Sequence, residues 1–557
     1  MMINHFQGVC GTGKTEQLIK NIELIRNTET STILWASLTN KLSEATCNRY
    51  KDQYPDHNVT LISSENCSSV HSEILQHIGR ASSLTTQILF ISHIALSMLS
   101  LDVLQQCTVI IDELPTLIGD YQRLKIPLQD ESMLGLTPYI EYEDSQFEGY
   151  QRIVIKEEMK LNAEQFAYNL LHNADSNSDS VKAGKLLMDV LHNSNGIFVS
   201  TIDNWKLFEF FTGLEFAKKL NQLESVWLLS ANLEGLFVGK LLSVYGCQIN
   251  IEHSLSHLNL PLTHPNTSNV EILPFLKNDS TTRSSSFSSY FASSSSSKVI
   301  KEYTEEIDVH QSFNQWVISQ FENNTFIYCK NKLTTSIHHS LAIKLPPMAQ
   351  GLNDYSHLNN VAFMPHLRPA PEHELAIKRL AIDIRVNPQI LVKSYINQTS
   401  YEAAYQFISR ISFRNLNRNE DGTLIEKQSQ PTCRIIVPDM AHAEYIYNMM
   451  PMASINTDSS YERVPYHLSE EELIQRQVNN SIRKAEKCVQ KQIHDFGILY
   501  AIYQLMENGL AAKSACEQLN ITARTRRNWF KRYGDDWTNW LTEQEMSLEL
   551  ERETEAS

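Results

Sequence analysis

The sequence predicts an α/β protein with parallel sheets and an all-helical module toward its C-terminus. Three observations indicate this class. Apolar runs that suit buried strands alternate with helical stretches from the first residues onward. A glycine-rich turn at Gln7–Thr15 joins the first strand to the first helix, and residues 498–533 carry only helical periodicity.

Composition indicates a large protein without disulfides or a membrane anchor. The chain of 557 residues, 42% of them apolar, has room for about three or four domains. Its nine cysteines include no C-x-x-C pair, which favours a reducing cytoplasm. No apolar run is long enough to cross a bilayer, and a strand begins too early for a leader peptide, so we expect no membrane partner. The net charge of −16 confines any nucleic-acid binding to local patches.

The stretch QGVCGTGKT, Gln7–Thr15, carries the most specific motif, G-x-x-x-x-G-K-[ST]. Its glycines permit positive φ, and its N–H groups can cradle phosphates at a helix N-terminus. We expect Lys14 to neutralise the β- and γ-phosphates and the Thr15 hydroxyl to bind Mg²⁺. The alternative is a glycine-rich turn with an incidental lysine. The residues expected to hold ATP are Gly8, Gly11, Thr12, Gly13, Lys14 and Thr15.

An acidic pair follows the apolar run CTVII at Cys107–Ile111. Parallel sheets bind ligands at the carboxyl ends of their strands, where Asp112 and Glu113 would lie. Asp112 suits a magnesium ligand that acts through water, and Glu113 suits the group that polarises an attacking water. A solvated loop start is the alternative for such a pair by itself.

These motifs together resemble the superfamily 2, DEAD/DEAH-like helicases. In that resemblance Gly8–Thr15 is motif I, and Asp112-Glu113-Leu114-Pro115 is motif II with an altered end. Leu38–Leu42 resembles motif Ia, and Ser92-His93-x-x-Leu96 resembles a strand-end element that touches the nucleic-acid backbone. The resemblance implies two RecA-like lobes and nucleic-acid contacts by Thr39, Asn40, Ser92 and His93.

The resemblance continues through the second half of the chain. Ser230-Ala231-Asn232-Leu233 is similar to motif III, Thr325–Cys329 to motif IV, and Gly351–Asp354 to motif V, in which Asp354 would reach the nucleotide. Tyr401–Arg414 is similar to motif VI. Gln406, Arg410 and Arg414 recur every four residues, so we expect one helix face to carry all three into the ATP site. Which arginine stabilises the γ-phosphate is open, and an amphipathic helix with a solvated basic face is the alternative.

Two segments interrupt this pattern. The segment 116–224 is too long for a single connection between a strand and a helix, which predicts an inserted, mostly helical subdomain. The segment contains no cysteine, so we expect no iron–sulfur cluster in it. Residues 278–298 are rich in serine and predict a flexible linker between the lobes.

The C-terminal region resembles a helix-turn-helix DNA-binding module. The helical stretches Ile498–Met506, Leu510–Leu519 and Thr522–Tyr533 are joined by short turns, and residues 513–534 hold six basic side chains against one acidic side chain. A helical docking module is the alternative. The expected DNA contacts are Arg524, Arg526, Arg527, Trp529 and Lys531.

The predicted organisation is therefore a first lobe at 1–115 and 225–277, an insertion at 116–224, a linker at 278–298, a second lobe at 299–460, a DNA-binding module at 461–534 and an acidic tail at 535–557. This predicts an ATP- and Mg²⁺-dependent helicase or translocase acting on DNA in replication, plasmid or phage maintenance, or defence, with partner proteins from those processes. The alternatives are an ATP-driven nucleoprotein remodeller that does not unwind, and a DNA-binding regulator whose ATPase lobes act as a sensor.

Overall fold

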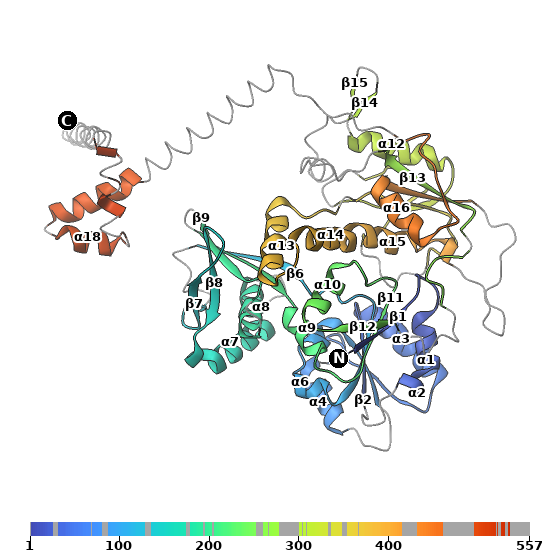
Figure 1. Cartoon of the computed structure of the whole chain (residues 1–557), viewed down its shortest axis with the longest axis horizontal. Helices are drawn as coiled ribbons and strands as arrows, with labels where there is room; N and C mark the ends of the chain where they lie inside the picture. The colour runs from blue at the N-terminus through green and yellow to red at the C-terminus, as the bar shows by residue number, and fades with distance from the viewer. Residues whose placement is uncertain are drawn as a thin grey trace, which may run out of the picture. The chain divides into compact units, whose positions relative to one another are not determined.

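The computed structural model describes most of the first 460 residues and part of the C-terminal region (Figure 1). The described residues are 2–25, 32–67, 69–80, 87–127, 135–173, 179–192, 195–202, 205–251, 260–265, 267–277, 300–302, 305–307, 309–331, 336–347, 354–365, 367–414, 432–460, 495–508, 510–519, 521, 525–527, 529 and 533–534. They fall into two compact units, Met1–Val464 and Pro465–Ser557, and each is described by itself.

The first lobe is built on a parallel sheet with the strand order β12-β1-β11-β5-β2-β4-β3. Its strands are β1 (Met2–Gln7), β2 (Thr32–Ser37), β3 (Asn58–Leu61), β4 (Gln87–Ser92), β5 (Cys107–Asp112), β11 (Val226–Ser230) and β12 (Gln248–Ile251). The central strands form because their runs are apolar and β-branched on both faces, which suits a sheet covered on both sides. The covering helices are α1 (Lys14–Lys20), α2 (Ile22–Ile25), α3 (Asn40–Gln53), α4 (Val70–Arg80), α5 (His93–Ser97), α6 (Leu101–Leu104), α9 (Leu214–Leu220) and α10 (Phe237–Val244).

The strand register places polar residues in one row along the carboxyl edge of this sheet. Gln7 lies opposite Ser230, and Ser37 lies opposite both Asp112 and Ser92. Strand β11 lies between β1 and β5, so the phosphate-loop strand and the acidic-pair strand are not direct neighbours. Ser230 therefore lies between the two motifs.

The insertion is a mixed α+β layer, and the prediction that it is mostly helical is wrong. An antiparallel sheet of order β6-β10-β9-β8-β7 packs on α7 (Lys160–Asn173) and α8 (Asp179–His192). The strands are β6 (Asp120–Pro127), β7 (Ile140–Asp144), β8 (Tyr150–Ile155), β9 (Phe198–Ile202) and β10 (Trp205–Thr212), with the 3₁₀ turn η1 (Glu157–Met159) before α7. Alternating polar and apolar residues along β6 and β8 suit a sheet that covers helices on one face.

The second lobe is built on a parallel sheet of order β17-β16-β18-β19-β13-β20. Its strands are β13 (Val270–Leu276), β16 (Phe326–Cys329), β17 (Ala342–Lys344), β18 (Asn360–Phe363), β19 (Cys433–Asp439) and β20 (Ser454–Ile455), and a small hairpin comprises β14 (Ile300–Glu302) and β15 (Glu305–Ile307). The helical segments are α12 (Val309–Phe321), α13 (Pro371–Asp383), α14 (Pro388–Ile396), the π-helical segment η3 (Asn397–Glu402), α15 (Ala403–Ile408), the 3₁₀ turn η4 (Ser412–Arg414) and α16 (Met440–Met449).

The predicted boundary between the lobes is wrong. Strand β13 was expected in the first lobe, but it pairs in parallel with β19, with Val270 opposite Cys433. Segment 278–298 therefore lies within the second lobe's chain, between β13 and α12, and does not join the lobes; apart from this position it lies outside the described residues. The cause is that a buried apolar strand does not reveal which sheet it will join.

Helices α13 and α14 belong by sequence to the second lobe but pack into the core of the first. Ile377, Leu380 and Leu391 are each fully buried there. Helix α13 also meets the insertion, where Arg379 pairs with Glu209 at 2.6 Å. The helical pair α13 and α14 thus contacts both the first lobe and the insertion, and it leads through η3 into α15 (Figure 1).

In the C-terminal unit the structure describes a helix at 495–507, α18 (Ala512–Gln518) and helical residues at 525–527. Ala515 is fully buried beside Ile502 and Cys516, so the small residue does lie at a close helix contact. Residues 520 and 522–524, at the predicted turn before the last helical stretch, lie outside the described residues, as do residues 461–494 and the acidic tail.

Candidate nucleotide-binding site

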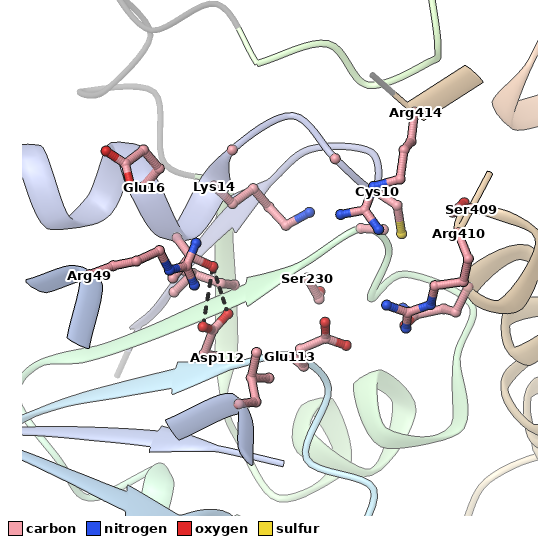
Figure 2. A pocket seen from close by; sticks show the side chains of 17 residues that line it. Cys10, Lys14, Glu16, Arg49, Asp112, Glu113, Ser230, Ser409, Arg410 and Arg414 are labelled. Atoms are coloured by element: carbon pink, nitrogen blue, oxygen red, sulfur yellow. Dashed lines mark hydrogen bonds between the residues drawn. The ribbon is translucent and has the colours of Figure 1, made fainter. Parts of the chain in front are cut away.

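A pocket of about 200 Å³ lies where the carboxyl edge of the first sheet meets α15 and η4 of the second lobe (Figure 2). Both lobes supply its walls. The lining residues are Cys10, Gly11, Gly13, Lys14, Thr15, Glu16, Leu42, Arg49, Asp112, Glu113, Leu229, Ser230, Ala231, Gln406, Ser409, Arg410 and Arg414. The sequence motifs expected to act together therefore meet in one cavity.

The glycine-rich loop has the backbone that its composition predicts. Gly11 and Gly13 have φ of 81° and 80°, values that glycine adopts readily and other residues rarely do. Lys14 Nζ donates to the carbonyl oxygens of Gly8 at 2.6 Å and Val9 at 3.2 Å. These are neutral acceptors within the loop, so a phosphate oxygen would be a stronger partner for the ammonium.

Two residues predicted to bind the nucleotide instead shape the loop from behind. Thr12 is only 2% exposed and its hydroxyl donates to the Val9 carbonyl at 2.8 Å. A Cβ on Gly8 would lie 3.0 Å from Thr12 Oγ1 and 3.2 Å from Leu260, so this glycine permits close packing. Neither residue lines the pocket.

Thr15 and Asp112 form the pair that suits a divalent cation. The Thr15 hydroxyl lies 3.2 Å from both carboxylate oxygens of Asp112 (Figure 2). Burial raises the pKa of Asp112 to about 6, and the neighbouring Glu113 adds to the increase. Oxygen ligands of this kind match the preference of Mg²⁺. Within the described part of the chain, no group of three or more His, Cys, Asp and Glu side chains could hold a metal ion.

Glu113 has a strained backbone at the end of β5. Its φ is 74°, in the left-handed region that disfavours side chains with a Cβ, and its N–H donates to the Leu229 carbonyl at 2.9 Å. Such strain persists only where surrounding structure enforces it and is concentrated at functional positions. The turn directs the Glu113 carboxylate into the pocket, toward Arg410 in the view of Figure 2.

The second lobe contributes Gln406, Arg410 and Arg414 to the pocket. They do not share one continuous helix as predicted, because α15 ends at Ile408 and Arg414 lies in η4. Burial lowers the pKa of the Arg410 guanidinium, while the negative charge of Glu113 acts in the opposite direction. Arg410 and Glu113 are thus electrostatic partners across the lobe boundary.

Direct contacts also join the second lobe to the loop. The Cys10 N–H donates to the Tyr405 hydroxyl at 3.0 Å. A Cβ on Gly11 would lie 2.7 Å from the Arg414 carbonyl oxygen, so Arg414 can approach only because residue 11 is glycine. Asp354, by contrast, is exposed and does not line the pocket, so its contact with a nucleotide stays a prediction.

The predicted nucleic-acid contacts in the first lobe have mainly structural partners. The Thr39 and Ser92 hydroxyls accept from the backbone N–H groups of Leu42 and Ala95, capping α3 and α5. Asn40 Nδ2 donates to Glu65 at 3.4 Å.

His93 is 2% exposed and lies 3.1 Å from the Asp112 carbonyl oxygen through Nε2. It therefore supports the acidic pair, and its ring does not lie at the surface where the predicted nucleic-acid contact would need it.

The C-terminal unit shows two of the predicted DNA contacts on its surface. Arg527 is exposed and Arg526 is half-buried near Met506. Trp529 packs on the cluster of Phe496, Leu499 and Tyr533, so it stabilises the module's core instead of presenting a free aromatic face. Arg524 and Lys531 lie outside the described residues.

Sequence reasoning missed several lining residues. Glu16 of α1 and Arg49 of α3 belong to no motif, and nothing in their spacing distinguishes them from ordinary surface positions of a helix. Leu42 lies in the segment that resembles motif Ia, and Cys10 lies inside the phosphate-loop motif at one of its variable positions, but neither was expected to line the pocket. Only the tertiary approach of α3 to the loop reveals the places of Leu42 and Arg49.

No protein-family model and no curated protein matches this sequence. Among solved structures, "XPD_Helicase" is 11% identical, with 82% of this chain and 96% of that chain covered and a TM-score of 0.41. "S. cerevisiae Dbp5 bound to RNA and ADP BeF3" is 11% identical, with 82% and 85% covered and a TM-score of 0.30. "Crystal Structure of DUF1998 helicase MrfA bound to DNA and AMPPNP" is 9% identical, with 82% and 50% covered and a TM-score of 0.27.

Among the residues that the structure describes, no helix has the length and apolar character needed to cross a membrane.

Proposed function

We propose that this chain is an ATP-dependent nucleic-acid helicase or translocase that uses Mg²⁺ and acts on DNA. One observation carries the proposal. Gln406, Arg410 and Arg414 of the second lobe line the same pocket as Lys14, Asp112 and Glu113 of the first. A site divided between two lobes is complete only when they are closed, so nucleotide hydrolysis can be coupled to their relative motion.

Binding begins at the glycine-rich loop. Lys14 exchanges its loop carbonyl partners for the β- and γ-phosphates, and the positive-φ glycines let backbone N–H groups approach the phosphate oxygens. Thr15 and Asp112 are the residues that would hold Mg²⁺, and the bound ion would neutralise phosphate charge. The raised pKa of Asp112 means that a proton competes with the cation below about pH 6.

Hydrolysis needs a positioned water and compensation for charge on the γ-phosphate. Glu113, held by its strained turn, accepts hydrogen bonds from the attacking water. Arg410 and Arg414 enter from the opposite lobe and stabilise the charge that develops on the transferred group. Loss of that charge on product release would weaken the hold between the lobes.

The mechanical output is proposed to be movement along a single strand, with the C-terminal unit binding duplex DNA. The exposed Arg527 and the half-buried Arg526 support a phosphate-contacting surface on that unit. An ATP-driven remodeller without unwinding is favoured by one observation, the burial of His93, which removes an expected grip on the strand.

The test is ATP turnover with and without single-stranded DNA for the wild type, Lys14→Ala and Glu113→Gln, together with strand displacement. We expect stimulation by DNA, loss of nucleotide binding in Lys14→Ala, and retained binding without turnover in Glu113→Gln. Stimulation without displacement favours the remodeller. Turnover that neither DNA nor Glu113→Gln alters contradicts the proposal.

A further inference from the structure

A buried carboxylate lies one helical turn before Gln406. Glu402, at the end of η3, is only 4% exposed, and both of its oxygens have donors. Oε1 accepts from Gln406 Nε2 at 3.0 Å, and Oε2 accepts from the Tyr445 hydroxyl at 2.7 Å. Since Gln406 lines the nucleotide pocket, Glu402 contacts a wall of the site without lining it.

The hydrogen-bond chain continues across the boundary between the lobes. The Tyr445 hydroxyl of α16 accepts from Asn232 Nδ2 at 3.1 Å, and Asn232 follows strand β11 of the first lobe. The Asn232 carbonyl accepts from the Ser230 hydroxyl at 3.0 Å, and Ser230 lines the pocket. The chain from Ser230 through Asn232, Tyr445 and Glu402 to Gln406 thus begins and ends at the nucleotide pocket.

Helix α16 holds this chain rigidly on the second-lobe side. His442, one turn before Tyr445, lies 2.9 Å from the Ser400 hydroxyl of η3 and 2.7 Å from Asp439. These three side chains have the contacts of a Ser-His-Asp hydrolase triad, but each is at most 1% exposed, so no substrate can reach them. Their effect is to fix η3 against α16 and hold Glu402 in place.

The chemistry of Glu402 determines how Gln406 is oriented. A carboxylate can only accept, so Gln406 must turn its NH₂ group toward Glu402, and its Oε1 remains as an acceptor. An acceptor at the pocket wall can orient a water beside Glu113, whereas the reversed amide would offer donors. A hydrogen bond to a charged group is strong enough to favour one orientation by about tenfold or more.

We propose that Glu402 and Tyr445 are positioning residues that hold the Gln406 amide in its water-orienting direction when the lobes are closed. Asn232, the donor that completes the chain, belongs to the first lobe, so lobe opening breaks the chain. Closure of the lobes therefore brings Arg410 and Arg414 into the site and fixes the orientation of the Gln406 amide. The inference rests on the proposed ATPase function and assigns a role to two side chains outside the pocket.

The experiment compares Tyr445→Phe and Asn232→Ala, singly and together, in the full-length chain. Each single variant is expected to lower the kcat of DNA-stimulated ATP turnover about tenfold while KM and the nucleotide Kd change less than twofold. The double variant is expected to lose no more than either single variant, because both break one chain. Tyr328→Phe is the matched control: it removes the hydroxyl of a second-lobe tyrosine that donates to the Ile337 carbonyl at 3.4 Å, and should leave kcat unchanged.

Thermal unfolding of each variant separates positioning from loss of structure. If Tyr445→Phe does not fold, Asn232→Ala decides, because Asn232 is half-buried at the start of the loop after β11. Two results overturn the inference, provided that Glu113→Gln still abolishes turnover. One is a kcat within twofold of the wild type in the single variants, and the other is a loss in the double variant that equals the product of the single losses. If Glu113→Gln leaves turnover intact, the proposed function itself fails, and this inference fails with it.

Discussion

Glu113 is predicted to lower the stability of the chain in order to place its carboxylate. Its φ of 74° in a residue with a Cβ costs about 1 kcal/mol, and glycine at the same position would avoid that cost. Glu113→Gly should therefore raise the free energy of unfolding by about 1 kcal/mol while it abolishes ATP turnover. Glu113→Gln keeps the strained backbone, so it should lose turnover by about 100-fold or more without gaining stability.

The structure supplies matched controls for strain without chemistry. Among described residues other than glycine, Glu322 and Arg385 also have positive φ, at 52° and 59°, and neither lines the pocket. Arg385→Gly should therefore give a similar gain in stability with unchanged turnover. The assays are urea unfolding without nucleotide and steady-state ATPase rates on the same preparations.

Two results would refute this reasoning about Glu113. If Glu113→Gly retains turnover within twofold of the wild type, the residue does not activate water. The second result concerns stability. If Arg385→Gly is more stable than the wild type but Glu113→Gly is no more stable than Glu113→Gln, the backbone of Glu113 is not strained.

Three further predictions address the lobe contact, the insertion and the pH dependence. Gly11→Ala should lower ATP turnover at least about tenfold because its Cβ would lie 2.7 Å from the Arg414 carbonyl oxygen. Gly149→Ala is the control: its φ is 78° and nothing lies within 4 Å of the added Cβ, so it should cost a similar stability, about 1 kcal/mol, and leave turnover unchanged. Arg379→Met should cost about 3–5 kcal/mol in urea unfolding by leaving the buried charge of Glu209, which also accepts from the Tyr121 hydroxyl, without its cationic partner. Arg379→Met combined with Glu209→Leu should cost less, and equal losses would contradict a buried ion pair. Burial lowers the pKa of His93 to about 4, below its value of about 6.5 in the unfolded chain. The free energy of unfolding should therefore fall as the pH drops from about 6.5 to 4, by about 1.4 kcal/mol per pH unit. His93→Gln should remove that contribution, and an unchanged pH slope in this variant would contradict the prediction.

The central strands of the first lobe could be predicted from sequence almost to the residue, whereas the edge strands β3 and β12 could not. Cys107–Asp112 and Gln87–Ser92 are short apolar runs, each reaching a polar residue at the carboxyl edge. Functional side chains at the carboxyl ends of parallel strands lie close together because those ends meet at one edge of the sheet. The glycine loop and the acidic pair could therefore be predicted to meet before any contact was known.

Residues from the second lobe were also predicted for the pocket, although their local structure differs. Gln406, Arg410 and Arg414 do line it, but α15 ends at Ile408, and a turn carries the last two inward. Spacing indicated a helix because a period of four residues looks the same whether or not the helix continues. The break becomes visible only when Arg414 is seen packed against Gly11.

The remaining differences have a common physical cause: pairing and burial are decided by distant parts of the chain. Val270–Leu276 could have joined either sheet, and its pairing with β19 depends on residues more than a hundred positions away. His93 has the sequence setting of an exposed strand end, but its ring meets the end of strand β5, which is separated from β4 by β2 in the sheet. The bond of Tyr445 to Glu402 likewise has no local signal.

The central claim is that second-lobe arginines complete a nucleotide site built on the first lobe. The most direct measurement is ATP turnover, with and without single-stranded DNA, for the wild type and for Arg410→Ala combined with Arg414→Ala, alongside nucleotide binding. If these arginines complete the site, ATP turnover should be stimulated by DNA in the wild type. In the double variant turnover should fall at least about 1,000-fold while nucleotide binding is retained. Turnover within tenfold of the wild type, still stimulated by DNA, would contradict it.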